Sequence, residues 1–181
     1  MTLVDHPLLF LYKSPDVACE LRQGVVELVV KETPEGYSIS PSINIKHEGV
    51  YIVKETPTRY QLIQVSEKQV QLAQAIGGNS LEIPLKGKEQ LERTLSGLST
   101  IMPLQSDLEF QNDNIPSVEP DTRIYVHLLP VGEGFDVEFY IKPFQVSAPY
   151  FKPGKGSARV VTKIEAIRTQ TKRDLAAEVK A

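Results

Sequence analysis

The sequence holds little cysteine and no long apolar run, and both absences narrow the classes of protein to which it can belong. Its single cysteine, Cys19, excludes an internal disulfide framework. The longest apolar run, residues 8–12, is far too short to span a bilayer, which takes about 20 residues. Asp5 and Pro7 interrupt the basic and apolar regions that a signal peptide needs. We therefore expect a cytoplasmic protein with no membrane partner.

Residue patterns of the common catalytic and metal sites are also missing. The three histidines, His6, His47 and His127, are far apart in sequence and form no His-Glu-x-x-His pattern or Cys/His cluster. No serine stands in a Gly-x-Ser-x-Gly setting. Lys155 lies in Pro-Gly-Lys-Gly-Ser, which fails the spacing of a phosphate-binding loop and is typical of a turn. We expect that this chain is not an enzyme and holds no cofactor, although a hydrolase site assembled from distant residues stays open as an alternative.

What the sequence does hold is a globular composition and a series of short strand patterns. Hydrophobic residues make up 41% and charged residues 24%, which is ordinary for a folded domain and argues against disorder throughout. One helix is predicted from a capping box of Ser66 and Gln69 to the glycines at 77–78, and another over residues 88–102. We predict an α+β fold, mainly antiparallel β-sheet with hairpins and two short helices. The predicted hairpins pair residues 24–31 with 37–45, 50–54 with 59–65, and 124–129 with 135–142.

The strand over residues 135–142 has the clearest alternation in the chain. Side chains alternate with a period of two along a strand, so every second residue shares a face. We expect the apolar set to be buried and the polar set to face solvent. The apolar set is Phe135, Val137, Phe139 and Ile141, and the polar set is Asp136, Glu138, Tyr140 and Lys142.

We expect the chain to divide at a polar stretch over residues 107–122. This stretch contains Pro116 and Pro120 and is predicted to form a loop or a joint. Residues 1–106 are the predicted strand-rich N-terminal part with two short helices, and residues 123–175 are a β-hairpin C-terminal part. Asp174 suits the N-cap of a last helix, of which residues 176–181 are the truncated start.

Charge is distributed unevenly along the chain. Residues 1–141 hold 11 basic and 20 acidic side chains, a net charge of −9, whereas residues 142–173 hold eight basic side chains and one acidic one, a net charge of +7. Basic side chains neutralise phosphates and aromatic rings stack on exposed bases, so this basic quarter is a candidate contact for nucleic acid or for another anionic partner. The competing interpretation is that these charges are solvated and these rings pack. The candidate residues are Lys142, Tyr150, Phe151, Lys152, Lys155, Arg159, Lys163 and Arg168.

Several strings of residues resemble the accessory segment that precedes the motor domains in large bacterial helicases of the Swi/Snf family, which are DEAD/DEAH-box-like ATP-driven DNA motors. The similarity spans nearly the whole chain and consists of strand and turn strings. One departure is the Glu165-Ala166 pair, where we expect an Asp-Gly turn in relatives. The strings are residues 6–10, 15–17, 53–60, 127–130, 132–134, 142–144, 149–156 and 173–175.

The resemblance implies that ATP-binding and helicase motifs follow beyond Ala181, since no residue of this chain matches them. The expected function is then that of a non-catalytic accessory or regulatory domain that contacts DNA or the helicase motor domains of the parent chain. The alternative is a purely structural or protein-interaction domain with no nucleic-acid contact.

Overall fold

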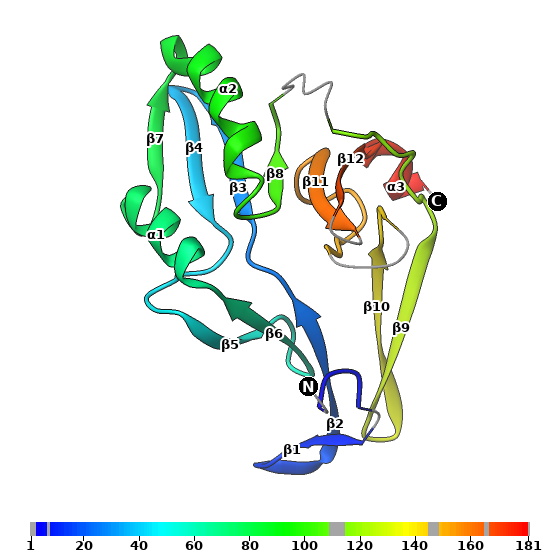
Figure 1. Ribbon diagram of the computed structural model, residues 1–181. Coiled ribbons are helices and arrows are strands. Elements are labelled where there is room, and N and C mark those ends of the chain that lie inside the picture. Colours follow the sequence, from blue (N-terminus) through cyan, green and yellow to red (C-terminus); the bar gives the residue numbers. More distant parts are fainter. Residues whose placement is uncertain (1–2, 7, 109–114, 145–148, 165–166, 181) are drawn as a thin grey trace.

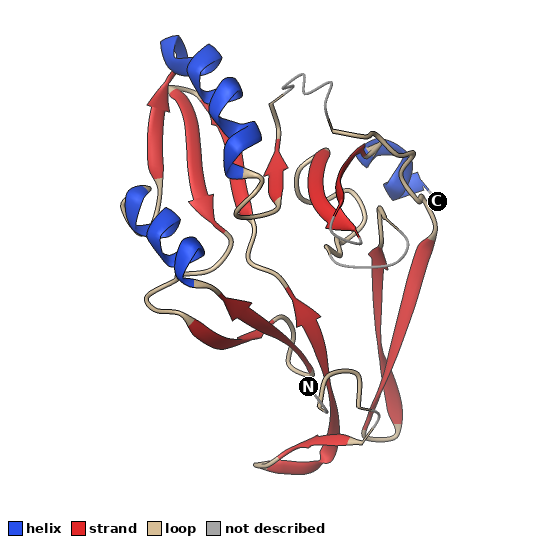
Figure 2. Cartoon of the chain, in the orientation of Figure 1, coloured by secondary structure: helices blue, strands red, loops and turns tan. Residues whose placement is uncertain are grey.

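A computed structural model describes residues 3–6, 8–108, 115–144, 149–164 and 167–180. Over these residues the chain forms twelve strands, most of them paired antiparallel, and three short α-helices. The predicted α+β class is therefore confirmed, with a third helix where only a truncated start was expected (Figure 2). None of the described helices is both long enough and apolar enough to cross a membrane.

A six-stranded sheet carries the main core. Its strands run in the order β12-β11-β8-β3-β4-β7 (Figure 1), and only the β3–β8 pair is parallel. It takes strands from both sides of the stretch predicted to be a joint, since β8 pairs with β3 on one side and β11 on the other. The strands are β3 (Leu28–Thr33), β4 (Gly36–Pro41), β7 (Leu81–Pro84), β8 (Leu104–Ser106), β11 (Arg159–Ile164) and β12 (Ile167–Lys172).

The turn between β3 and β4 shows why glycine is needed at position 36. Gly36 lies directly opposite Pro84 in the β4–β7 ladder. A Cβ atom at this position would overlap the backbone of Ile83 and Pro84. The absence of a side chain at Gly36 lets β7 pair closely at this turn. The predicted hairpin is confirmed, since β3 and β4 pair antiparallel.

Two helices pack against this sheet. Helix α1 (Glu67–Ala75) follows the predicted capping box, in which Gln69 Oε1 accepts a hydrogen bond from the Ser66 backbone N–H at 2.9 Å. It ends before Gly77, whose φ of 84° is a left-handed conformation that favours glycine. Helix α2 (Lys88–Leu98) follows a 3-10 turn, η1 (Leu85–Gly87), and is shorter than predicted. The buried apolar side chains of both helices join those of β3, β4 and β8 in one core cluster.

A four-stranded sheet, in the order β1-β2-β6-β5, extends away from the first sheet (Figure 1). The β5–β6 hairpin was predicted and is confirmed, whereas the β1–β2 hairpin was not predicted. Strand β2 pairs parallel with β6, which brings Glu20 beside Arg59. The strands are β1 (Leu9–Leu11), β2 (Ser14–Gly24), β5 (Gly49–Lys54) and β6 (Arg59–Val65).

The third sheet is the predicted hairpin of β9 (Ile124–Val131) and β10 (Gly134–Ile141), joined at Gly132, whose φ is 58°. The predicted alternation is present, but its orientation is the reverse of the expected one. Phe135, Val137 and Phe139 are exposed, and of the apolar set only Ile141 is buried. Glu138 and Tyr140, expected in solvent, are part-buried on the side that faces β2 and β6. The polar face turns inward because charged side chains of β2 and β6 need partners there.

Helix α3 (Leu175–Lys180) begins at the predicted cap, since Asp174 Oδ1 accepts hydrogen bonds from the N–H groups of Ala176 and Ala177. A buried ion pair holds it in place: Arg173 Nη2 lies 2.7 Å from Glu178 Oε2. Glu178 Oε2 also accepts the Gly154 N–H at 2.9 Å, which fixes the turn over residues 152–155. This Pro-Gly turn agrees with the interpretation made from the sequence.

One buried carboxyl group stands out in the loop before β3. Glu27 is 8% exposed, and its Oε2 accepts a hydrogen bond from the side chain of Gln105. Its Oε1 is buried and has no hydrogen-bond partner among the described residues. Burial raises the pKa of Glu27 from 4.5 to about 7, with the Gln105 contact acting in the opposite direction. Its ionised form therefore destabilises the fold.

We predict that the free energy of unfolding contains a contribution from Glu27 that falls as the pH rises from 4.5 through about 7. This contribution falls with rising pH because the folded state binds the Glu27 proton more tightly than the unfolded state does. Glu27→Gln is expected to stabilise the protein at pH 8, by at most about 3 kcal/mol, and to change little at pH 4.5. Urea unfolding followed by circular dichroism measures both values. Glu82→Gln, at an exposed carboxylate, is the control; an equal effect of Glu27→Gln at both pH values would contradict the prediction.

Candidate functional site

The eight candidate contact residues do not form one surface. Lys142, Tyr150 and Lys152 lie beside the inward, polar face of the β9–β10 hairpin, where Arg22 and Arg59 also lie. Phe151 borders the same place but is buried. The other four residues, Lys155, Arg159, Lys163 and Arg168, belong to the turn after Pro153 and to strands β11 and β12.

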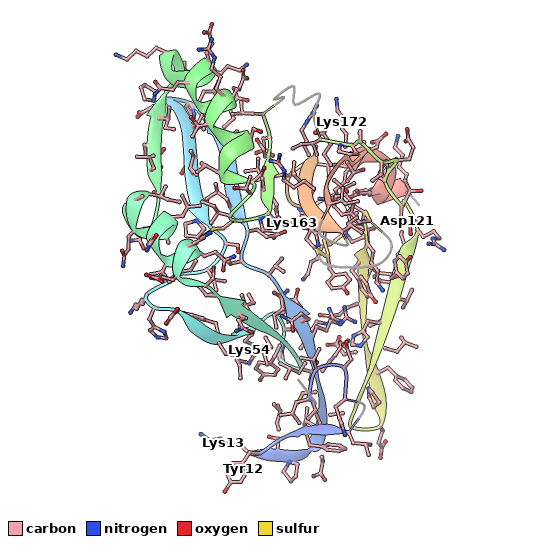
Figure 3. The ribbon with its side chains drawn as sticks, in the orientation of Figure 1. Tyr12, Lys13, Lys54, Asp121, Lys163 and Lys172 are labelled. Carbon is pink, nitrogen blue, oxygen red and sulfur yellow. The ribbon has the colours of Figure 1, made fainter. Side chains whose placement is uncertain are left out.

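Two of these four cations attach the β11–β12 hairpin to helix α2 and the turn that follows it. Lys163 Nζ donates to the Thr100 carbonyl at 3.1 Å, and Arg168 Nη1 donates to the Ser96 carbonyl at 2.9 Å. Figure 3 labels Lys163, which lies on the side of β11 nearer to α2. Carbonyl groups at the end of a helix have no partner within the helix and carry partial negative charge. Arg168 therefore satisfies a carbonyl group in the last turn of α2, and Lys163 satisfies one in the turn that follows the helix.

Phe151 is buried because it packs against Arg173 and the glycine-rich turn. The guanidinium carbon of Arg173 lies 4.0 Å from the centre of the Phe151 ring, and Arg173 Nη1 donates to the Ser157 carbonyl. A Cβ atom on Gly156 would lie 2.8 Å from the same ring. The Pro-Gly-Lys-Gly string thus forms a tight packing unit around Phe151 and α3.

Three tyrosines and two cations form the group that we call the tyrosine–cation cluster: Tyr125, Tyr140, Tyr150, Arg22 and Lys142. The rings of Tyr125 and Tyr140 stack at 5.6 Å, and the Tyr150 ring meets Tyr140 edge-on at 5.7 Å. Lys142 Nζ lies 4.6, 5.7 and 5.5 Å from the centres of Tyr125, Tyr140 and Tyr150. The Arg22 guanidinium lies 4.9 Å from Tyr140 and 5.2 Å from Tyr150. These are cation–π distances, which hold positive charge against aromatic rings.

An ion network beneath the cluster holds the hairpin against β2 and β6. Its centre is Arg59, a buried residue that forms ion pairs with Glu20 of β2 and Glu138 of β10. Arg59 Nη2 also contacts His127 Nδ1 of β9, while His127 Nε2 lies 2.9 Å from Glu20 Oε2. Arg22 completes the group with a second ion pair to Glu20. We call Glu20, Arg22, Arg59, His127 and Glu138 the Arg59 network.

The network requires neutral His127 in one tautomer. A guanidinium can only donate hydrogen bonds, so His127 Nδ1 must accept from Arg59, and Nε2–H must donate to Glu20. Burial lowers the pKa of His127, the Glu20 charge opposes this, and the nearby arginine charges add to the lowering. Protonation of His127 would place an N–H against the Arg59 guanidinium.

Between the network and the cluster lies a small pocket of about 110 Å³. Its lining combines cations and aromatic rings with two carboxylates, Glu55 and Glu138. The groups that line it include Arg22, Arg59, Tyr140, Tyr150 and Lys152. Within the described part of the chain, no three His, Cys, Asp or Glu side chains gather in a way that could hold a metal ion.

Comparisons of this chain with protein-family models, with curated proteins and with solved structures find no match. The family resemblance therefore stays a prediction, and the geometry of the site carries the functional argument.

Sequence reasoning missed Arg22, Arg59, Tyr125 and Tyr140 as members of the site. The signal for the two tyrosines is the polar and aromatic alternation on both strands of the hairpin, in which Tyr125 and His127 lie opposite Tyr140 and Glu138. Arg22 and Arg59 lie on β2 and β6, and their place in the site depends on pairing between distant strands. Tyr125 is further held by Asp121, whose Oδ2 accepts its hydroxyl at 2.9 Å. The hydrogen bonds from Arg123 keep the pKa of Asp121 at about 2, so this acceptor stays ionised.

We predict that protonation of His127 loosens the hairpin. Because the pKa of His127 is lowered in the folded state, its contribution to stability is present above its ordinary value of 6.5 and is lost as the pH falls below it. In His127→Gln the amide can accept from Arg59 and donate to Glu20 without titrating. The difference in unfolding free energy between the wild type and His127→Gln should therefore depend on pH below about 6.5. A pH-independent difference, or an equal pH dependence in the control His47→Gln, would count against this role.

Proposed function

We propose that this chain is a non-catalytic accessory domain of a larger bacterial Swi/Snf-like ATP-driven DNA helicase or translocase, and that it contacts DNA through the tyrosine–cation cluster. The resemblance of its strand and turn strings supports the first half of this proposal. The second half rests on one observation: two cations, Arg22 and Lys142, lie within 6 Å of the same tyrosine rings beside a small pocket. The proposed location is the cytoplasm.

The chemistry of the cluster fits single-stranded DNA better than a duplex. Single strands expose bases, which stack on aromatic rings, while Lys and Arg neutralise the adjacent phosphates. Tyr150 is part-buried, and the exposed Lys152 lies two residues further along the chain. A duplex keeps its bases stacked inside and would be held by the cations alone. The proposed preference is therefore for single strands.

The ion pairs of the network set a limit on this contact. Arg22 and Arg59 are already neutralised by Glu20 and Glu138, so the free positive charge of the site comes from Lys142 and Lys152. Phosphate contacts are then few, and stacking on tyrosine supplies the rest of the affinity.

We predict that Tyr150→Ala weakens binding of single-stranded DNA about tenfold, because stacking on one ring contributes about 1–3 kcal/mol. Lys142→Gln should lower the slope of log K against log salt by about one, which is the loss of one phosphate contact. Fluorescence anisotropy with a labelled single strand and the matching duplex, over a series of salt concentrations, measures both effects.

Lys68→Gln and Lys86→Gln are matched controls, since both lysines are exposed and lie on other elements. Unchanged affinity in Tyr150→Ala, or no DNA binding by the wild type at low salt, would remove the cluster as a DNA contact.

The second candidate function, a protein-interaction domain with no nucleic-acid contact, is favoured by a different observation. The face of the β9–β10 hairpin that points away from the Arg59 network exposes large apolar side chains. Such a face is typical of a surface that binds another protein. In this role the chain would bind protein, such as the motor domains, and would show no DNA binding in the anisotropy titration.

A further inference from the structure

The outward face of the β9–β10 hairpin, which we call the outer face, gathers five exposed large apolar side chains. Its central side chains are between 47% and 67% exposed. They share one face because their positions pair across the ladder, Val137 with Leu128 and Phe139 with Val126. The five side chains are Val126, Leu128, Phe135, Val137 and Phe139.

A covering partner is expected for a face of this kind. A two-stranded sheet has little stability of its own in water, and sheets normally bury their apolar face against another layer. Here the layer that packs on the hairpin lies on the polar side, at the Arg59 network. Over most of its length the apolar side has no such layer among the described residues.

The outer face carries both a projection and a groove. The projection is Phe135, next to the turn and 67% exposed. The groove lies at the other end of the hairpin, with a volume of about 430 Å³, between Phe139 on the sheet and Val179 on helix α3. Ile124 and Val137 also line it, and Val179 is itself 70% exposed. The groove is large enough for an aromatic ring.

Projection and groove are placed symmetrically along the strand. Phe135 lies two residues before Val137 and Phe139 lies two residues after it, which is about 7 Å in each direction along β10. A two-fold axis that lies in the interface above Val137, parallel to the outer face and perpendicular to β10, would therefore bring the Phe135 of one copy over the Phe139 end of the other. Two-fold symmetric contacts of this kind are self-complementary.

Opposite charges lie at the two ends of the outer face. Glu133 lies in the exposed turn at the tip of the hairpin, and the exposed Lys152 lies at the edge of the groove. In the two-fold arrangement each tip glutamate comes to the groove end of the other copy, where Lys152 is. Opposite charges at the rim fix the register of an interface.

We propose that the outer face binds a second copy of this chain, in a two-fold dimer in which Phe135 of each copy enters the groove of the other. Five half-exposed apolar side chains and Val179 correspond to roughly 500 Å² per copy, so the dimer would bury roughly 1,000 Å² in total. This area is at the lower limit for a specific interface, and the expected dimer is therefore a reversible one. The proposal does not rest on DNA binding, although Lys152 belongs to both surfaces.

Sedimentation equilibrium of the purified chain over a range of concentrations tests the proposal. We expect a monomer–dimer equilibrium in the micromolar range, and Phe135→Ser should weaken it at least tenfold. Glu133→Lys and Lys152→Glu should each weaken it, and the double variant should recover most of the loss because it restores the opposite charges. In a Cys19→Ser background, Val137→Cys at the axis should form a disulfide between the two copies on oxidation.

Ile52→Ser is the matched control, because Ile52 is 66% exposed on β5 of another sheet. A wild-type chain that stays monomeric at the highest concentration overturns the proposal and leaves the outer face to a different protein. A dimer that Phe135→Ser and the charge exchange do not affect overturns it as well, because the contact then lies elsewhere. Failure here and failure of the DNA proposal are distinguishable, since Phe135→Ser should leave DNA affinity unchanged and Tyr150→Ala should leave the mass unchanged.

Discussion

The buried guanidinium of Arg59 is the constraint on which the arrangement of the hairpin depends. A charged group in the interior needs ionic and hydrogen-bonding partners, because an uncompensated buried charge costs several kcal/mol. Arg59 on β6 finds Glu20 on β2, Glu138 on β10 and His127 on β9. The β9–β10 hairpin can supply two of these partners only by turning its polar face inward. Its apolar face is then exposed, and this inversion creates both surfaces to which we assign a function.

The two proposed functions use opposite faces of the same hairpin. The inward face places Tyr125 and Tyr140 beside Lys142 and Arg22, where cations and rings lie together next to a small pocket. The outer face offers Phe135 and a groove. The two surfaces meet at Lys152, which borders both the small pocket and the groove.

Much of the local structure could be predicted from the sequence, because it depends on neighbouring residues. The capping box at Ser66, the Asp174 cap and the hairpin turn at Gly132 all follow from short-range chemistry. A period of two showed correctly that β10 has an apolar and a polar face, but periodicity does not say which face is inside. That choice depends on Arg59, which is 39 residues from Glu20 and 68 from His127 in the sequence. Likewise, the sequence places Lys163 and Arg168 in a basic segment. It does not show that they donate hydrogen bonds to carbonyl groups in the last turn of α2 and just after it.

Hydrogen–deuterium exchange of the β9 and β10 amides in the wild type and in Arg59→Met tests most directly whether the Arg59 network holds the hairpin in its inverted orientation. Methionine keeps the apolar stem and removes the charge, so the account predicts that the hairpin amides exchange much faster while those of β3 and β4 stay protected as an internal reference. The wild-type hairpin should show protection that is lost in the variant without global unfolding. Equal protection of β9 and β10 in both proteins would contradict the account, because the hairpin would then be held by something other than Arg59.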